Sequence, residues 1–183
     1  MRQYLNKKRT GIIEKFLGCK LADLDLGAGK STKASISVDI NKEFRPDIVA
    51  DVQCLPIRHE TFDSVICSHV IEHVEDLNRA IDEMKRVLRK NGIAIFFLPD
   101  DGSMLWRILR PFWTIYYETA VSRQDSPKSH VHSFDLERFG KTFGKSFELL
   151  EVGKINFGME IYAICKHPLI GERCTLNNVS VRT

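Results

Sequence analysis

The stretch LADLDLGAGKST, residues 21–32, limits the possible folds more than any other part of this chain. An apolar run that leads into two closely spaced glycines is typical of a strand that ends in a tight turn. Its last residues resemble the end of a phosphate-binding P-loop, but the P-loop pattern requires a glycine where the chain has Leu24. The dinucleotide-binding pattern G-x-G-x-x-G fails as well, because Thr32 stands at the third glycine position. The sequence therefore predicts a strand followed by a glycine turn that is neither a P-loop nor a dinucleotide-binding loop.

Apolar segments that alternate with helical or loop crossovers predict a parallel, doubly wound sheet. The clearest helix is expected over 74–88, where apolar residues recur at a spacing of about 3.6. Asn91-Gly92 is expected to stop this helix, with Gly92 in the left-handed conformation. Other helices are expected over residues 3–17 and 135–144, with a helical, aromatic-rich segment over 101–121. The expected strands cover residues 21–26, 35–38, 48–50, 62–68, 93–98, 147–155 and 160–165.

Together these elements predict a single-domain, Rossmann-like α/β fold with a mostly parallel, seven-stranded sheet and an antiparallel edge strand. The distance from Gly29 to Asp39 is only ten residues. A turn, a three-turn helix and a strand do not fit this length at about 1.5 Å and 3.3 Å per residue. The first crossover helix is therefore expected to be shortened or absent. The domain is expected to cover residues 1–167, with 101–133 as a substrate lid insertion and 168–183 as a mobile tail.

The composition is that of an ordinary globular protein. The chain has 183 residues, of which 43% are hydrophobic, enough for one domain with a full core. A net charge of +3 is too small to indicate a nucleic-acid partner, although it does not exclude one. The five cysteines form no C-x-x-C pair, which suggests free thiols in a reducing cytosol. No apolar run approaches the ~20 residues of a membrane span, so we expect a cytoplasmic location; the oligomeric state is not readable.

Several acidic residues stand at the ends of the expected strands, where ligands of open α/β sheets bind. Asp39 ends the second strand and is placed to accept hydrogen bonds from two ribose hydroxyls. Asp51 ends the third strand and is placed to accept one from an exocyclic amine. Asp25 adds a third carboxylate. These charges favour a ligand that carries positive charge over a nucleoside triphosphate.

The ordered set of strand-end segments resembles the class I S-adenosylmethionine-dependent methyltransferases, of the type that acts on small molecules. The matching stretches are DLGAG (25–29), SVDI (37–40), IVADVQCLPI (48–57), TFDSVICSHVIEHVEDL (61–77) and EMKRVLRKNGIAIFFLPD (83–100). The resemblance implies S-adenosyl-L-methionine as cofactor, with the glycine turn at its methionine, Asp39 at its ribose, and Asp51 with the Val52 N–H at its adenine. The cofactor-binding set that we expect is Asp25, Gly27, Ala28, Gly29, Asp39, Ile40, Asp51, Val52 and Ser68.

His69 is the leading candidate for a general base, because it lies just past the fourth strand, next to the expected methyl group. The alternative is a histidine that only packs at the strand end. His69, Glu72 and His73 share one face of a helical turn and form an alternative, metal-binding set. They resemble the E-x-x-E-H metal motif of quinone O-methyltransferases and small-RNA 2′-O-methyltransferases, with His in place of the first Glu. A Glu-His pair here can also serve structure alone, so the prediction is no metal.

The acceptor is expected to lie against the segment 101–133. Trp106, Trp113, Tyr117 and His130 are the candidate substrate residues, although some of these aromatic side chains are expected to pack on the core instead. The predicted function is methyl transfer from S-adenosylmethionine to a small aromatic or lipid-like acceptor by in-line displacement. Two alternatives stay open at this point: a binding module without catalysis, and a nicotinamide-dependent oxidoreductase.

Overall fold

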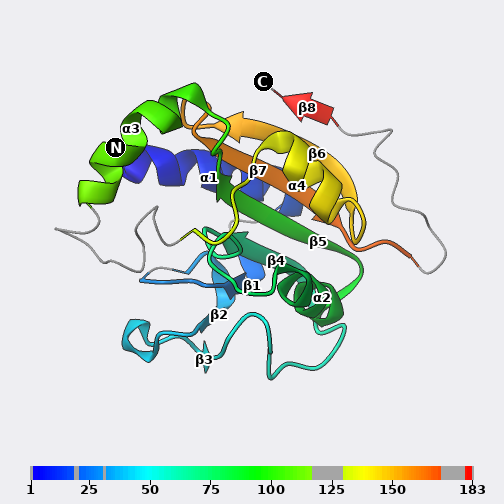
Figure 1. The fold of residues 1–183 in the computed structure, drawn as a ribbon. Coiled ribbons are helices and arrows are strands. Elements are labelled where there is room, and N and C mark those ends of the chain that lie inside the picture. Colours follow the sequence, from blue (N-terminus) through cyan, green and yellow to red (C-terminus); the bar gives the residue numbers. More distant parts are fainter. Residues whose placement is uncertain (1, 19–20, 31, 117–129, 170–179, 183) are drawn as a thin grey trace.

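The computed structural model describes residues 2–18, 21–30, 32–116, 130–169 and 180–182 (Figure 1). Its helices are α1 (Arg2–Leu17), the 3-10 turn η1 (Lys42–Phe44), α2 (Leu77–Val87), α3 (Met104–Tyr116) and α4 (Leu136–Phe143). Its strands are β1 (Ala22–Leu26), β2 (Ala34–Asp39), β3 (Ile48–Val49), β4 (Phe62–Ser68), β5 (Leu88–Pro99), β6 (Glu148–Ile155), β7 (Glu160–Lys166) and β8 (Ser180–Arg182).

The strands form one sheet in the order β3-β2-β1-β4-β5-β7-β6-β8. The first five strands in this order are parallel to one another. Strand β7 runs antiparallel to both β5 and β6. The chain order turns back between β1 and β4, so the carboxyl ends of these two strands flank the switch point where ligands of such sheets bind. The predicted mostly parallel α/β sheet is confirmed.

The seven predicted strands are all present, and β8 adds a short eighth one that pairs with β6. As predicted, no helix separates β1 from β2 in the described part of that crossover. The expected helix over 74–88 was too long at both ends, since α2 begins at Leu77 and ends at Val87. Its carboxyl end is early because Leu88 already pairs with Phe62 of β4. Asn91, and not Gly92, adopts the left-handed conformation, with φ 63°, which asparagine tolerates.

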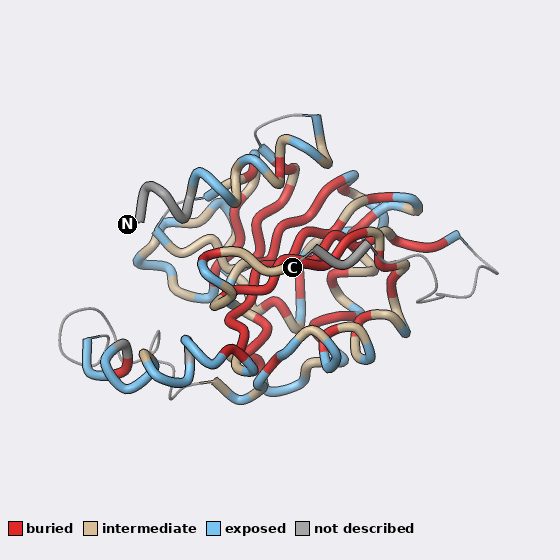
Figure 2. The backbone as a smooth tube through the Cα atoms, turned by 90° about the horizontal axis from the view of Figure 1, so that it is seen from above, coloured by how far each residue is buried: buried red, intermediate tan, exposed pale blue. Residues whose placement is uncertain are grey.

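The helices cover the two faces of the sheet unequally. Two of them, α2 and α4, pack on one face and form the larger core with alternate residues of β1, β4 and β5. Helix α1 packs on the other face through Ile13, against Ile66 and Ile95. Figure 2 shows the buried residues concentrated in the sheet between these layers. The cover on both faces explains why residues 65–67 of β4 and 93–98 of β5 are apolar runs.

An aromatic cluster holds α4 to the sheet. The rings of Phe139 and Phe143 stack at 4.3 Å between centroids, and both contact Phe96 of β5. Asp135 caps the helix, because its carboxylate accepts a hydrogen bond from the Arg138 backbone N–H at 2.7 Å. The described helices include none that is long and apolar enough to cross a lipid bilayer.

Candidate functional site

The glycine turn after β1 is shaped by close packing. Gly27 and Gly29 have φ values of 72° and 58°, in the region that favours glycine. The backbone N–H groups of Gly27 and Ala28 both donate to the carbonyl oxygen of Val38, at 2.8 and 3.1 Å. A Cβ on Gly27 would lie 2.1 Å from Cγ2 of Val70, whereas one on Gly29 would meet open space. The turn therefore leaves free space beside Gly29, on the side where a ligand would approach.

Asp39 ties this turn to the end of β2. Its carboxylate is only 8% exposed and accepts hydrogen bonds from the backbone N–H groups of Gly29 and Asn41, both at 2.8 Å. Each carboxylate oxygen takes one of these bonds, so each keeps a lone pair for a further donor. Ile40, the next residue, is 70% exposed. The geometry gives Asp39 a structural role in addition to the predicted contact with a ribose.

Asp51 is held by the residue that follows Val52. Its carboxylate accepts from the backbone N–H of Gln53 at 2.8 Å and from the side-chain amide of Gln53 at 3.0 and 3.1 Å. The amide oxygen of Gln53 accepts in turn from the N–H of Asp76, the N-cap of α2, at 2.8 Å. Asp51 is half-buried, while Val52 is buried. Asp51 is thus linked to α2 through Gln53, and its contact with adenine stays a prediction.

Asp25 lies below the turn, inside the protein. It is 2% exposed, and its carboxylate accepts a hydrogen bond from the Lys33 backbone N–H at 2.8 Å. Burial raises the pKa of Asp25, although its hydrogen bond from Lys33 opposes this rise. Asp25 therefore fixes the short crossover between β1 and β2, and a direct contact with the cofactor stays a prediction.

His69 follows β4 directly and lies in a charged cluster. Its backbone is left-handed, with φ 57°, an uncommon conformation for a residue with a side chain. Nδ1 of the ring lies 3.3 Å from Oε1 of Glu72, and Nε2 lies 3.3 Å from Oε1 of Glu160. Nη2 of Arg9 lies 2.7 Å from both Nε2 of His69 and Oε1 of Glu160. The ring is thus placed between two carboxylates, with one guanidinium beside it.

This environment favours the protonated ring. Burial opposes a charge on His69, but contacts with the carboxylates of Glu160 and Glu72 outweigh that effect and raise the pKa of His69 to about 9. Arg9 acts in the opposite direction and reduces the rise. The 2.7 Å contact with Nη2 of Arg9 acts against this, because a guanidinium only donates and therefore needs an unprotonated Nε2. The role of His69 as a general base stays a prediction.

Sequence reasoning missed Arg9 and Glu160. Arg9 lies on α1, and Glu160 begins β7, so neither is near His69 in the sequence. Glu160 is a buried carboxylate at the start of an otherwise apolar strand, and that contrast is a signal that the sequence offers. No comparable signal singles out Arg9 among the basic residues of α1.

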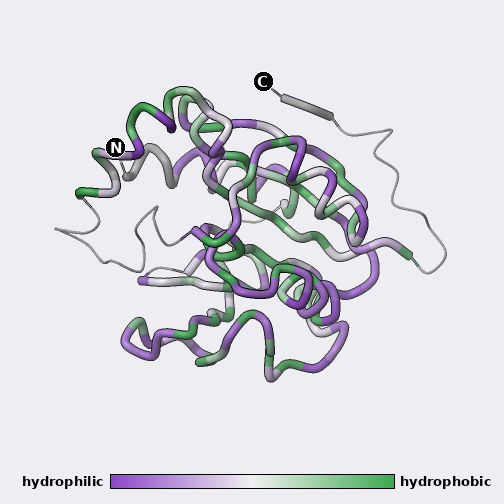
Figure 3. Tube along the Cα trace, viewed as in Figure 1, coloured by the Kyte–Doolittle hydropathy of each residue, from purple (hydrophilic) through white to green (hydrophobic). Residues whose placement is uncertain are grey.

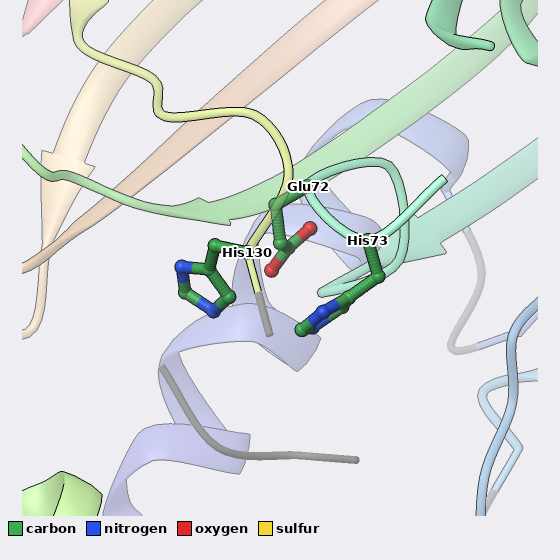
Figure 4. Close-up of side chains that lie close together, drawn as sticks. All are labelled: Glu72, His73 and His130. Carbon is green, nitrogen blue, oxygen red and sulfur yellow. The ribbon is translucent and has the colours of Figure 1, made fainter. Parts of the chain in front are cut away.

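The alternative metal set is only partly reproduced. Glu72 and His73 lie in the turn after β4, as the sequence indicated, but His130 joins them in place of His69 (Figure 4). One ligand atom from each of these three residues lies within 4.8 Å of the others. His130 had been expected to contact the substrate.

The segment after β5 leaves the sheet at its carboxyl edge and returns there. The N–H of Asp101 donates to the carbonyl of Phe134 at 2.9 Å, and the N–H of Phe134 donates to the Asp101 carboxylate at 3.2 Å. Between these ends, α3 is the described part of the insertion. Trp106 and Trp113 lie within α3, and Tyr117 lies outside the described residues. The segment between Asp101 and Phe134 thus has its two ends joined, and its role as a substrate lid stays a prediction.

Helix α3 carries large apolar side chains that the described protein leaves uncovered. Met104, Ile108, Phe112 and Ile115 are 77%, 55%, 70% and 61% exposed. Their spacing of three or four residues places them on one side of the helix. Figure 3 shows hydrophobic residues recurring along α3 between hydrophilic ones. The insertion thus presents an apolar stripe beyond the carboxyl end of β5.

A separate cavity of about 410 Å³ lies at the opposite edge of the sheet, near the amino ends of β4 and β5. None of the predicted site residues lines it. Because ligands of this architecture bind at the carboxyl edge, we place the functional site there and not in the cavity. The residues that line the cavity are His59, Glu60, Asp82, Lys85, Arg86, Lys90 and His167.

Part of this chain is similar to methyltransferase domains of known proteins. Residues 12–96 match a family model described as a methyltransferase domain. An uncharacterized protein of Methanocaldococcus jannaschii is 34% identical over 73 residues, 38% of this chain and 32% of that protein. The malonyl-[acyl-carrier protein] O-methyltransferase of Geobacter sulfurreducens is 29% identical over 92 residues, 50% of this chain and 34% of that protein. The human mitochondrial arginine-hydroxylase NDUFAF5 is 32% identical over 94 residues, 51% of this chain and 24% of that protein.

Solved structures share the whole fold at lower identity. An S-adenosylmethionine-dependent methyltransferase of Thermotoga maritima superposes with a TM-score of 0.62 at 18% identity, covering 91% of this chain and 97% of that one. The PH0226 protein of Pyrococcus horikoshii gives 0.65 at 18% identity, covering 91% and 92%. The chain spans about a third to a half of the first curated relatives that it matches. Residues 12–96 thus resemble a methyltransferase domain, and the chain shares its fold with S-adenosylmethionine-dependent methyltransferases.

Proposed function

We propose that this protein transfers a methyl group from S-adenosylmethionine to a small apolar acceptor, either aromatic or lipid-like. The observation that carries the acceptor class is the apolar stripe of α3, formed by Met104, Ile108, Phe112 and Ile115. These exposed side chains lie on the insertion that starts and ends at the carboxyl edge of the sheet. An apolar acceptor would cover part of them and thereby remove apolar surface from water.

The residues at the switch point fit the cofactor. The open space beside Gly29 lets a ligand approach the backbone, and Asp39 keeps unused lone pairs for hydroxyl donors. Asp51 is half-buried at the end of the neighbouring crossover, within the same edge. We therefore assign the ribose to Asp39 and the adenine amine to Asp51. When bound, S-adenosylmethionine supplies an electrophilic methyl group on a sulfonium that is a good leaving group.

The chain itself positions and shields the reactants. The turn at Gly27 and Gly29 fixes the approach of the methionine end, and the α3 insertion holds the acceptor and excludes water. His69 lies at the end of β4, and Arg9 and Glu160 hold its ring in place. We keep His69 as the candidate group for moving a proton, should the acceptor atom carry one to be lost.

The direct test is transfer of a labelled methyl group. The full chain, incubated with methyl-labelled S-adenosylmethionine and a panel of small acceptors, is expected to label apolar aromatic or lipid-like compounds in preference to polar ones. Mass spectrometry of the product distinguishes an added methyl group from an added oxygen, which matters because one relative is named a hydroxylase. Binding of the cofactor without label transfer to any acceptor class would favour a binding module instead.

A further inference from the structure

A cluster of polar side chains beside His69 takes no part in the function proposed above. Glu72 and His73 come from the turn after β4, and His130 comes from the end of the α3 insertion. One carboxylate oxygen and one nitrogen from each ring lie within 4.8 Å of one another. Figure 4 shows the carboxylate of Glu72 between the two imidazole rings.

Glu72 is a buried acidic residue, and its partner His69 also contacts Glu160. Its surface is 0% exposed, and neither carboxylate oxygen has a hydrogen-bond partner among the described residues. The nearest cationic group that the structure gives is Nδ1 of His69, at 3.3 Å. A buried carboxylate without hydrogen bonds is unfavourable unless a cation accompanies it.

His130 lies beside Glu72 and His73 in this cluster. Its Nδ1 is buried and has no hydrogen-bond partner among the described residues. The ring packs edge-on against His73, with 4.8 Å between centroids and 75° between planes.

Backbone hydrogen bonds next to His130 hold this residue in the cluster. The N–H groups of Val131 and His132 both donate to the backbone carbonyl of Glu72, at 2.7 and 3.0 Å. The end of the insertion is therefore attached to the turn after β4 independently of the imidazole rings. This attachment keeps His130 beside Glu72 even when its side chain is replaced.

We propose that Glu72, His73 and His130 bind a divalent transition-metal ion such as Zn²⁺. Two imidazole nitrogens and one carboxylate oxygen suit Zn²⁺ and its neighbours, whereas Mg²⁺ and Ca²⁺ prefer oxygen ligands. At Zn–ligand lengths of about 2.0–2.1 Å, tetrahedral ligand atoms lie about 3.3 Å apart. The half-buried rings of His73 and His130 therefore rotate inward on binding. Three protein ligands leave a coordination position for water or for an oxygen of the acceptor.

Metal binding is measured on the full chain after removal of metal with a chelator. Titration calorimetry with Zn²⁺ is expected to give one site per chain, and Co²⁺ at the same site is expected to add visible absorption bands. His130→Ala and His73→Ala are each expected to weaken Zn²⁺ binding at least tenfold, because each removes one of three ligands. His59→Ala is the control, because His59 is exposed and lies at the opposite edge of the sheet.

Two results overturn the proposal. One is a parent protein that binds no Zn²⁺ at one ion per chain. The other is unchanged Zn²⁺ affinity in both His130→Ala and His73→Ala, with His59→Ala lowering it. If an alanine variant fails to fold by circular dichroism, the glutamine variant at the same position, His130→Gln or His73→Gln, replaces it, since glutamine keeps the polar volume without the imidazole. None of these measurements needs an acceptor or methyl transfer, so they test the metal site separately from the proposed function.

Discussion

Replacing Asp39 by alanine is expected to loosen the glycine turn as well as to weaken cofactor binding. The change removes two charge-assisted hydrogen bonds, to the N–H groups of Gly29 and Asn41, both 2.8 Å long. Such bonds contribute about 1.5–3 kcal/mol each. At the lower value for both, the free energy of unfolding falls by about 3 kcal/mol. With a urea m-value of about 2 kcal/mol per molar, the midpoint of unfolding falls by about 1.5 M.

The assay combines urea unfolding with calorimetric titration of S-adenosylmethionine. The affinity of Asp39→Ala for the cofactor is expected to fall at least tenfold, a loss of about 1.4 kcal/mol. Asp63→Ala is the matched control, because Asp63 is 73% exposed and makes a surface ion pair with Arg89 that contributes at most about 1 kcal/mol. An Asp39→Ala variant with the urea midpoint of the parent would refute the turn-holding role, and unchanged affinity would refute the ribose contact.

Three further results are expected. Gly27→Ala should lower the free energy of unfolding by about 2 kcal/mol or more, because the new Cβ would overlap Val70 and the positive φ adds strain. Chemical denaturation measures this change, and an unchanged unfolding midpoint would contradict it. In the folded protein Cys54 should react with thiol reagents while Cys67 should not, because Cys54 is exposed and burial raises the pKa of Cys67. Peptide mapping after alkylation shows which of the two cysteines has reacted. Phe112→Ser should raise KM for an apolar acceptor while leaving the melting temperature nearly unchanged, because Phe112 is 70% exposed; a KM equal to that of the parent would separate α3 from acceptor binding.

Local patterns in the sequence were enough to predict the sheet. Buried parallel strands are continuous apolar runs, and β4 and β5 could be recognised for that reason. The same local reasoning placed the end of α2 too late, because the residues after Val87 also suit a helix. The pairing of Leu88 with Phe62 decides the boundary, and a long-range contact of that kind leaves no local pattern.

Local patterns indicated which residues stand at the carboxyl ends of the strands, but they did not indicate the charged residues around His69. Asp39 and Asp51 could be placed because they end strands, and strand ends in a parallel sheet meet at one edge. Arg9 and Glu160 were missed because their contacts with His69 depend on how α1 and β7 pack. His130 was assigned to the substrate because its contact with the turn after β4 depends on the path of the insertion.

The most direct measurement for the whole account is calorimetric titration of the parent protein with S-adenosylmethionine, S-adenosylhomocysteine and NAD. The account predicts one site per chain for the first two ligands, no saturable heat with NAD, and weaker binding of S-adenosylmethionine to Asp39→Ala. Saturable binding of NAD without binding of S-adenosylmethionine would contradict the account and would point to an oxidoreductase on the same fold.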